Sequence, residues 1–152
     1  MIPTSGAQQR LTGRLTVPLP PDQAFRLFTP RGEQDWVHQW KPHFPAPTID
    51  DTAPATVFET HAHHQTTTWV VVDSTPGKRI QYTRVTPHTD AGTVTVTLDE
   101  ADGRSEVTVT YELTALTDSA NRRLHEFAEQ YPAFLQSWQD AITATLHTKD
   151  RQ

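Results

Sequence analysis

The segment 117–148 places the strongest constraint on the fold of this chain, because its apolar residues recur at the spacing of an α-helix. These residues are large and mostly aromatic: Leu124, Phe127, Ala128, Tyr131, Phe134, Leu135, Trp138, Ile142 and Leu146. Burying each large side chain would contribute about 2 kcal/mol, so this face needs a broad partner surface rather than a single neighbouring helix. The periodicity continues across Pro132, which predicts a kinked but unbroken helix.

Strands elsewhere in the chain are predicted to supply that partner surface. Alternating apolar and polar residues predict strands at 9–17, 57–63, 67–72, 80–85, 93–98 and 107–113, with a turn at 64–66. Asp102-Gly103 is typical of a two-residue hairpin turn, and Pro76-Gly77 occupies the central positions of a type II turn. We therefore expect an α+β fold in which one curved antiparallel sheet wraps around the C-terminal helix.

Two short helices are predicted between the first strand and the rest of the sheet. Pro21 suits the first turn of one helix, and Thr29-Pro30 suits the start of another. The second helix is expected to display Trp36, Val37 and Trp40 before a run of prolines ends it.

Length and composition exclude several classes of protein. The 152 residues predict one domain spanning 1–152, with its core at about 9–148. Cysteine is absent, so disulfides, thiolate metal sites and cysteine nucleophiles are impossible. The net charge of -5 at pH 7, with scattered basic residues, argues against a nucleic-acid partner. No apolar run approaches the length of a membrane span or signal peptide, so we expect a cytoplasmic protein without membrane insertion.

Several local sequences resemble the START/birch-pollen-allergen (SRPBCC) superfamily, in particular its polyketide cyclase/dehydrase-like branch. They are AFRLFTP at 24–30, WVHQW at 36–40, VFET at 57–60, TWVV at 68–71, RIQY at 79–82 and VTVTYE at 107–112. The resemblance implies the helix-grip fold: a strand, two helices, a run of strands and a C-terminal helix. It also implies binding of apolar small molecules between helix and sheet, and in some members polyketide cyclase or aromatase activity. The segment 49–56 lacks the glycine-rich loop of plant-type members, so plant-type ligand binding is not carried over.

Strand alternation places an aromatic-rich surface opposite the helix, and a pocket between the two surfaces is expected to bind ligand. The candidate ligand-binding residues are Trp36, Trp40, Phe58, Trp69, Tyr82, Arg84, Val96, Tyr111, Phe127, Tyr131 and Phe134. Arg84 has two interpretations. Its guanidinium either reaches water or a surface carboxylate, or it anchors an anionic group of the ligand. Trp36 and Trp40 fit either core packing or the mouth of the pocket.

The histidines give a weak metal signal. His61 and His63 are predicted to lie on one strand face with Glu59, but that face is expected to be exposed and the ligand set incomplete. We therefore expect no metal and no other cofactor. His38, between the two tryptophans, is the only histidine placed to act as a general base near the pocket mouth.

Three classes of function remain open from the sequence. The first is binding of a small, largely apolar, aromatic, polyketide-like or lipid-like molecule by a carrier or sensor. The second is a cofactor-independent enzyme of the cyclase or dehydratase type, which would need an acid-base pair inside the pocket. The third is a protein-interaction module resembling the heat-shock-ATPase activators, which would need a large exposed apolar patch. A homodimer is compatible with all three.

Overall fold

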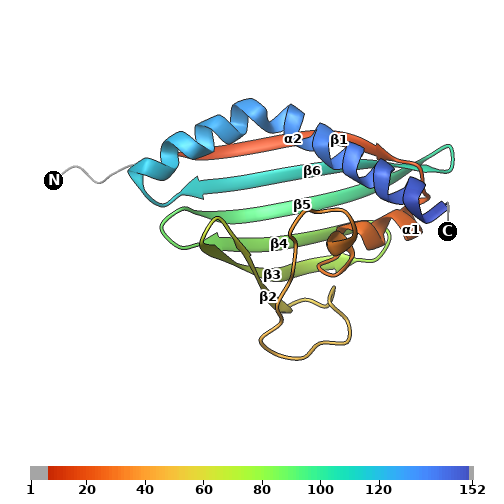
Figure 1. The fold of residues 1–152 in the computed structure, drawn as a ribbon, viewed down its shortest axis with the longest axis horizontal. Coiled ribbons are helices and arrows are strands. Elements are labelled where there is room, and N and C mark those ends of the chain that lie inside the picture. The colour runs from red at the N-terminus through yellow and green to blue at the C-terminus, as the bar shows by residue number, and fades with distance from the viewer. Residues whose placement is uncertain (1–6, 151–152) are drawn as a thin grey trace.

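A computed structural model describes residues 7–150 as a six-stranded antiparallel sheet that packs against a long C-terminal helix (Figure 1). The strands are β1 (Gln8–Val17), β2 (Val57–Ala62), β3 (Gln65–Thr75), β4 (Arg79–Thr86), β5 (Asp90–Ala101) and β6 (Arg104–Ala115), in the spatial order β1-β6-β5-β4-β3-β2. The helices are α1 (Pro21–Ala24), the 3₁₀ helices η1 (Phe25–Phe28) and η2 (Gly32–Asp35), and α2 (Asp118–Asp150). This arrangement confirms the predicted α+β helix-grip fold.

The core lies between α2 and the concave face of the sheet. The predicted inward positions of the strands are buried, among them Val71, Ile80, Val107 and Val109, and α2 contributes Leu124, Tyr131, Leu135 and Ile142. The helix continues through Pro132, as its unbroken apolar periodicity predicted. Residues 1–6 and 151–152 of the predicted domain lie outside the described part of the chain. Within the described part, no helix is both long enough and apolar enough to cross a membrane.

Two of the turns form as the sequence predicted. Asp102 and Gly103 connect β5 to β6 with φ angles of 54° and 78°. Positive φ at both central residues gives the turn a twist that matches the paired strands, which is why Asp-Gly is favoured there. Gly77 has a φ angle of 79° between β3 and β4, and the backbone N–H of Lys78 donates to the carbonyl of Thr75 at 2.9 Å.

The predicted turn between β2 and β3 was wrong by one residue at its start and by two at its end. β2 ends at Ala62 and β3 begins at Gln65, so the turn consists of His63 and His64 rather than residues 64–66. Their φ angles of 52° and 64° fit a two-residue hairpin turn. His63 is consequently a turn residue, and it does not share a strand face with His61 as the sequence analysis expected.

The predicted second helix is shorter than expected. It is the four-residue 3₁₀ helix η2, and it ends before Trp36, whose φ angle of −136° is not helical. The physical reason is that the two indoles are bonded to the chain that precedes them. The Nε1–H of Trp36 donates to the carbonyl of Leu27, and that of Trp40 to the carbonyl of Pro30, both at 2.7 Å. These bonds fold the segment back on itself instead of extending a helix.

We predict that Gly32→Ala destabilises the fold by about 1–3 kcal/mol, whereas Gly13→Ala costs much less. A Cβ at Gly32 would lie 1.6 Å from the backbone oxygen of Arg26, which cannot move without shifting the chain. A Cβ at Gly13 would meet the Cδ1 atom of Leu135 at 2.5 Å, and this flexible side chain can turn away. Urea unfolding of both variants tests the difference, and equal costs would contradict it.

Candidate functional site

An inner pocket of about 170 Å³ lies between the sheet, α2 and the segment that carries η2. Most of its wall is aromatic or aliphatic, and four polar or ionisable side chains interrupt that wall. The lining residues are Glu33, Val37, Trp40, Phe58, Trp69, Tyr82, Arg84, Val94, Val96, Tyr111, Phe134 and Trp138. An engineered apolar cavity of about 150 Å³ is known to bind benzene. The inner pocket therefore has room for about one substituted aromatic ring.

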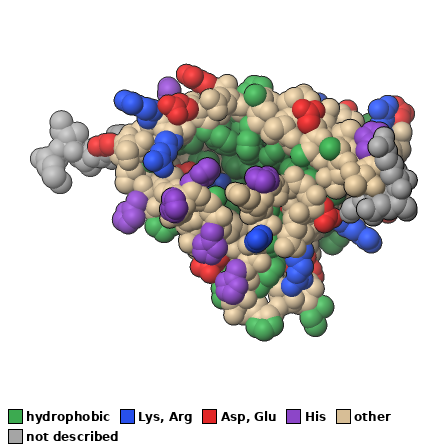
Figure 2. Space-filling view, viewed as in Figure 1, with side chains coloured by type: hydrophobic (Ala, Val, Ile, Leu, Met, Phe, Trp, Pro, Cys, Tyr) green, Lys and Arg blue, Asp and Glu red, His purple; other side chains and the backbone are tan. Residues whose placement is uncertain are grey.

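An outer pocket of about 710 Å³ lies on the other side of Arg84 and is more open and more polar. It is bounded by the β2–β3 turn, the connection from β4 to β5, and the N-terminal half of α2. Its lining residues are His63, His64, Gln65, Arg84, Thr89, Asp90, Leu113, Ala120, Arg123, Leu124 and Phe127. Figure 2 shows a hollow with a hydrophobic floor and with histidine and cationic side chains at its rim. Arg84 lines both pockets and so marks their common boundary.

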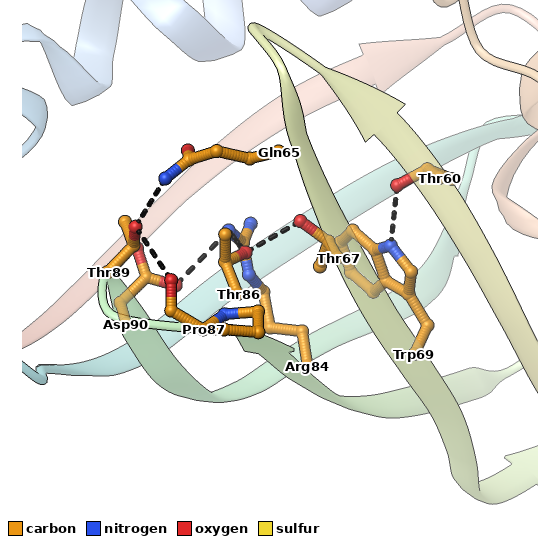
Figure 3. Close-up of polar contacts among 9 residues, drawn as sticks. All are labelled: Thr60, Gln65, Thr67, Trp69, Arg84, Thr86, Pro87, Thr89 and Asp90. Carbon is orange, nitrogen blue, oxygen red and sulfur yellow. Dashed lines mark hydrogen bonds and ion pairs between the residues drawn. The ribbon is translucent and has the colours of Figure 1, made fainter.

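Arg84 is held in place by three contacts (Figure 3). Its Nη2 atom lies 3.2 Å from Oδ1 of Asp90 and donates to Oγ1 of Thr86 at 3.4 Å. Its guanidinium carbon lies 5.1 Å from the ring centroid of Trp69, which adds a cation–π attraction. The Nε atom is buried and has no hydrogen-bond partner among residues 7–150. The structure thus combines features of both interpretations: a carboxylate partner and a place in the pocket wall.

The three tyrosines of the protein differ in how their hydroxyls are used. The hydroxyl of Tyr82 donates to the carbonyl of Phe28, and that of Tyr131 donates to the carbonyl of Val109, each at 2.7 Å. The hydroxyl of Tyr111 has no hydrogen-bond partner within the described residues, although its ring lines the inner pocket. Burial raises the pKa of Tyr111; the nearby Arg84 opposes that shift, and Glu33 adds to it. Tyr111 is therefore a neutral hydroxyl that faces the pocket without a partner.

Glu33 is the ionisable residue that the sequence analysis missed. It comes from η2 and lines the inner pocket, and its carboxyl forms no hydrogen bond or ion pair within residues 7–150. Burial raises the pKa of Glu33 well above the ordinary value of 4.5. No charged partner compensates this burial, because the guanidinium of Arg84 is already paired with Asp90. This environment favours the protonated form of Glu33 more than water does.

The segment that carries Glu33 is fixed by local backbone bonds and side-chain contacts rather than by strand pairing. The backbone N–H of Glu33 donates to the carbonyl of Thr29 at 3.1 Å, and Gly32 allows this turn to pass close to the preceding chain. Tyr82 ties β4 to the carbonyl of Phe28, one residue before Thr29. Trp40 packs against Phe58 and Trp69 with ring centroids 6.0 and 5.6 Å away. Glu33 therefore projects from a well-anchored turn.

Most of the predicted ligand-binding residues meet at the inner pocket. Eight of them line it: Trp40, Phe58, Trp69, Tyr82, Arg84, Val96, Tyr111 and Phe134. Phe127 lines the outer pocket instead. Trp36 and Tyr131 line neither pocket, because Trp36 packs between Phe28 and Trp138 and Tyr131 bonds to the sheet backbone. Whether the lining residues bind a ligand stays a prediction.

The residues that sequence reasoning left out of the site are Glu33, Val37, Val94 and Trp138. For three of them the sequence pattern already indicated a position facing the core. Trp138 was already on the apolar stripe of the helix and Val94 on the inward face of its strand, and Val37 was among the displayed residues of the second helix. Glu33 precedes Val37 and Trp40 by four and seven residues, a spacing that favours one face, but its charge made an exposed position the simpler expectation.

The histidines do not assemble a metal centre in the described part of the chain. No group of three or more His, Asp or Glu residues within it lies close enough to hold an ion. His61 is exposed, and its Nδ1 atom lies 2.8 Å from Oγ1 of Thr66. His38 is exposed and lines neither pocket. His63 and His64 instead form part of the outer rim.

Comparison with known proteins identifies the family. Residues 8–136 match the family model described as polyketide cyclase/dehydrase and lipid transport. The chain belongs to this family. It thereby falls within the SRPBCC superfamily that the local sequences resemble. A search of curated proteins found no significant match.

Solved structures with low sequence identity share the fold. DynU16, a protein from the dynemicin biosynthetic locus, is 16% identical with a TM-score of 0.65, and the match covers 92% of this chain and 48% of DynU16. This chain thus spans about half the length of DynU16. Ara h 8.0201 is 16% identical with a TM-score of 0.65, covering 93% and 99% of the two chains. Norcoclaurine synthase of Thalictrum flavum, solved with a transition-state analogue, is 12% identical with a TM-score of 0.64, covering 97% and 99%.

We predict that Glu33→Gln raises the stability of the protein at neutral pH and leaves it nearly unchanged below pH 4.5. Between the unfolded and the folded pKa the native state binds more protons than the unfolded state, so stability falls as pH rises through this window. Glutamine does not titrate, so the variant keeps the stability that the wild type loses as pH rises. The resulting difference in the free energy of unfolding should reach about 1.4 kcal/mol for each unit by which the pKa of Glu33 is raised.

Denaturant unfolding of both proteins across this pH range provides the measurement. Glu129→Gln is the matched control, because Glu129 is an exposed glutamate on α2. A stability difference between the Glu33→Gln variant and the wild type that does not increase with pH would show that the Glu33 carboxyl is not buried in its neutral form.

Proposed function

We propose that this protein binds a small, largely apolar molecule, aromatic, polyketide-like or lipid-like, in the pocket between the sheet and α2. The observation that carries the proposal is an aromatic-lined space with room for a ring and a few polar groups without partners. Ligand sites are typically concave and mostly apolar, with a small number of polar groups that fix orientation. The family to which the chain belongs, described by cyclase, dehydrase and lipid-transport functions, is consistent with such a ligand.

Arg84 is the proposed polar anchor. It lies where the inner and outer pockets meet, and the contacts with Asp90 and Trp69 hold its guanidinium in one orientation. A ligand with its ring in the inner pocket would thus place a polar substituent beside Arg84 and extend toward the outer pocket. Because Asp90 already offsets the positive charge, Arg84 would offer a ligand acceptor a hydrogen bond from its guanidinium rather than a full net charge.

We predict that Arg84→Met weakens binding of 1-anilinonaphthalene-8-sulfonate more than binding of N-phenyl-1-naphthylamine. The second compound lacks the sulfonate but keeps both aromatic ring systems. The difference should be about 1.5–3 kcal/mol if the arginine forms a charge-assisted hydrogen bond to the sulfonate. Fluorescence titration of both dyes into both proteins measures it.

Two control variants distinguish the loss of the hydrogen bond from Arg84 to the ligand from other effects of Arg84→Met. Arg79→Met removes another arginine of β4, one that pairs with Asp73 and lines neither pocket, and should change neither affinity. Combining Arg84→Met with Asp90→Asn removes the carboxylate that the first substitution leaves unpaired. Equal weakening of both dyes by Arg84→Met would leave Arg84 with a structural role only.

A second candidate function is a cofactor-independent enzyme of the cyclase or dehydratase type. The observation that favours it is that Glu33 and Tyr111, both able to donate a proton, line the same pocket and lack partners in the described chain. Such a site would hydrogen-bond a substrate carbonyl while the neighbouring carbon loses a proton to solvent. A homodimer and an interaction module remain predictions without a supporting contact.

We predict for this second function that the protein speeds deuterium incorporation into the methyl group of acetophenone in heavy water. Hydrogen bonding of the carbonyl oxygen by Glu33 would stabilise the enol that exchanges the methyl proton. Proton NMR follows the loss of the methyl signal, with buffer alone as the reference. Exchange no faster than in buffer would exclude this chemistry for aryl ketones and leave the binding function standing.

A further inference from the structure

We propose that Glu33 makes the inner pocket selective for ligands with a neutral hydrogen-bond acceptor, such as an aryl ketone, by donating a hydrogen bond to the carbonyl oxygen. This inference rests on the proposed binding function and specifies the ligand class. It concerns the inner pocket alone, where Glu33 lies, and does not depend on the outer rim.

The first support is the lack of any partner for the Glu33 carboxyl. The carboxyl lines an otherwise aromatic and aliphatic space and forms no hydrogen bond or ion pair within residues 7–150. Glu33 is partly buried, and its carboxyl oxygens are not among the fully buried atoms that lack a partner, so they stay accessible to a molecule in the pocket. A hydrogen bond with such a molecule would satisfy the acid. The position of Glu33 on an anchored turn makes relaxation away from the pocket difficult.

The second support is the chemistry of the groups that face Glu33. β4 contributes Tyr82, whose hydroxyl donates to Phe28, and Arg84, which is paired with Asp90. β6 contributes Tyr111, whose hydroxyl is free within the described chain. The remaining elements, including β2, β3 and α2, contribute only apolar and indole side chains to this wall. No cation is therefore available to hold Glu33 as a carboxylate, and burial raises the pKa of its side chain.

The third support is that the unpartnered polar groups of the pocket are mainly donors. They are the acid proton of Glu33 and the hydroxyl of Tyr111. A ligand that brought only another donor would satisfy few of them. A carbonyl oxygen carries two lone pairs and no proton, so it complements this set. The surrounding rings then accommodate the aryl part of the ketone.

Calorimetric titration with acetophenone and ethylbenzene tests the inference. Both molecules are single aromatic rings of nearly equal size, but only acetophenone carries an acceptor. The measured quantity is the preference, defined as the dissociation constant of ethylbenzene divided by that of acetophenone. It is determined for the wild type and for the variants Glu33→Met, Glu33→Gln and Glu129→Gln.

Glu33→Met deletes the donor and should lower the preference about five- to tenfold, the effect of one hydrogen bond. Glu33→Gln keeps an N–H donor without a titratable proton and should retain most of the preference. Glu129→Gln changes an exposed glutamate and should match the wild type. The affinity for ethylbenzene reports in each case whether the pocket is intact.

The pH dependence gives an independent readout. From pH about 5 to about 10, a range that spans the pKa values known for buried glutamates, the wild-type preference should fall as Glu33 loses its proton. The preference of Glu33→Gln should stay constant, although this variant keeps the histidines of the outer rim. A wild-type preference that increases with pH would overturn the proposal, because a carboxylate has no proton to donate.

Two outcomes separate this inference from the binding function. If neither molecule binds to the wild type, the proposed binding function fails for single-ring ligands, and the selectivity of Glu33 fails with it. If both bind with the same preference in the wild type and Glu33→Met, the binding function stands and only the role of Glu33 is overturned. Loss of the preference in Glu33→Gln as well as in Glu33→Met would also overturn the donor role.

Discussion

The packing of the apolar face of α2 against the concave sheet is the interaction on which the rest of this structure depends. Large aromatic residues occupy both surfaces, and many of their contacts are edge-to-face, as between Tyr111 and Phe134 with ring centroids 5.9 Å apart. Rings arranged in this way over a curved surface leave space that smaller aliphatic side chains would fill. The aromatic packing that holds the helix and the sheet together therefore also leaves a pocket between them.

The candidate site has an enclosed, largely apolar end and a more open, more polar end. Toward η2, rings and indole hydrogen bonds surround the inner pocket, and the partly buried acid Glu33 is part of its wall. Toward the β2–β3 turn, the wall becomes polar and includes histidines and Arg123. Arg84 lies at the transition, neutralised by Asp90. A ligand with an apolar ring and a polar extension would match this gradient better than a uniformly apolar one.

The sequence predicted the fold well because its signals are local and repeated. Alternation in the strands, Asp102-Gly103, and the stripe along α2 each depend on neighbouring residues alone. Glu33 could not be predicted in the same way, because an acidic residue on a short helix is exposed in most proteins. Its partial burial follows from the tertiary placement of η2 against the inner pocket. The His63–His64 turn was missed because His-His is not one of the sequences typical of a two-residue hairpin turn, such as Asn-Gly or Asp-Gly.

The segment from Thr29 to Trp40 forms one wall of the inner pocket without belonging to the sheet. The indole N–H groups of its two tryptophans donate to the carbonyls of Leu27 and Pro30, which are close in sequence. The hydroxyl of Tyr82 on β4 adds a hydrogen bond from the sheet to the carbonyl of Phe28. The strands keep their register whatever side chain occupies position 33. A substitution at position 33 can therefore change the shape and polarity of this wall, while the sheet and α2 remain a constant scaffold.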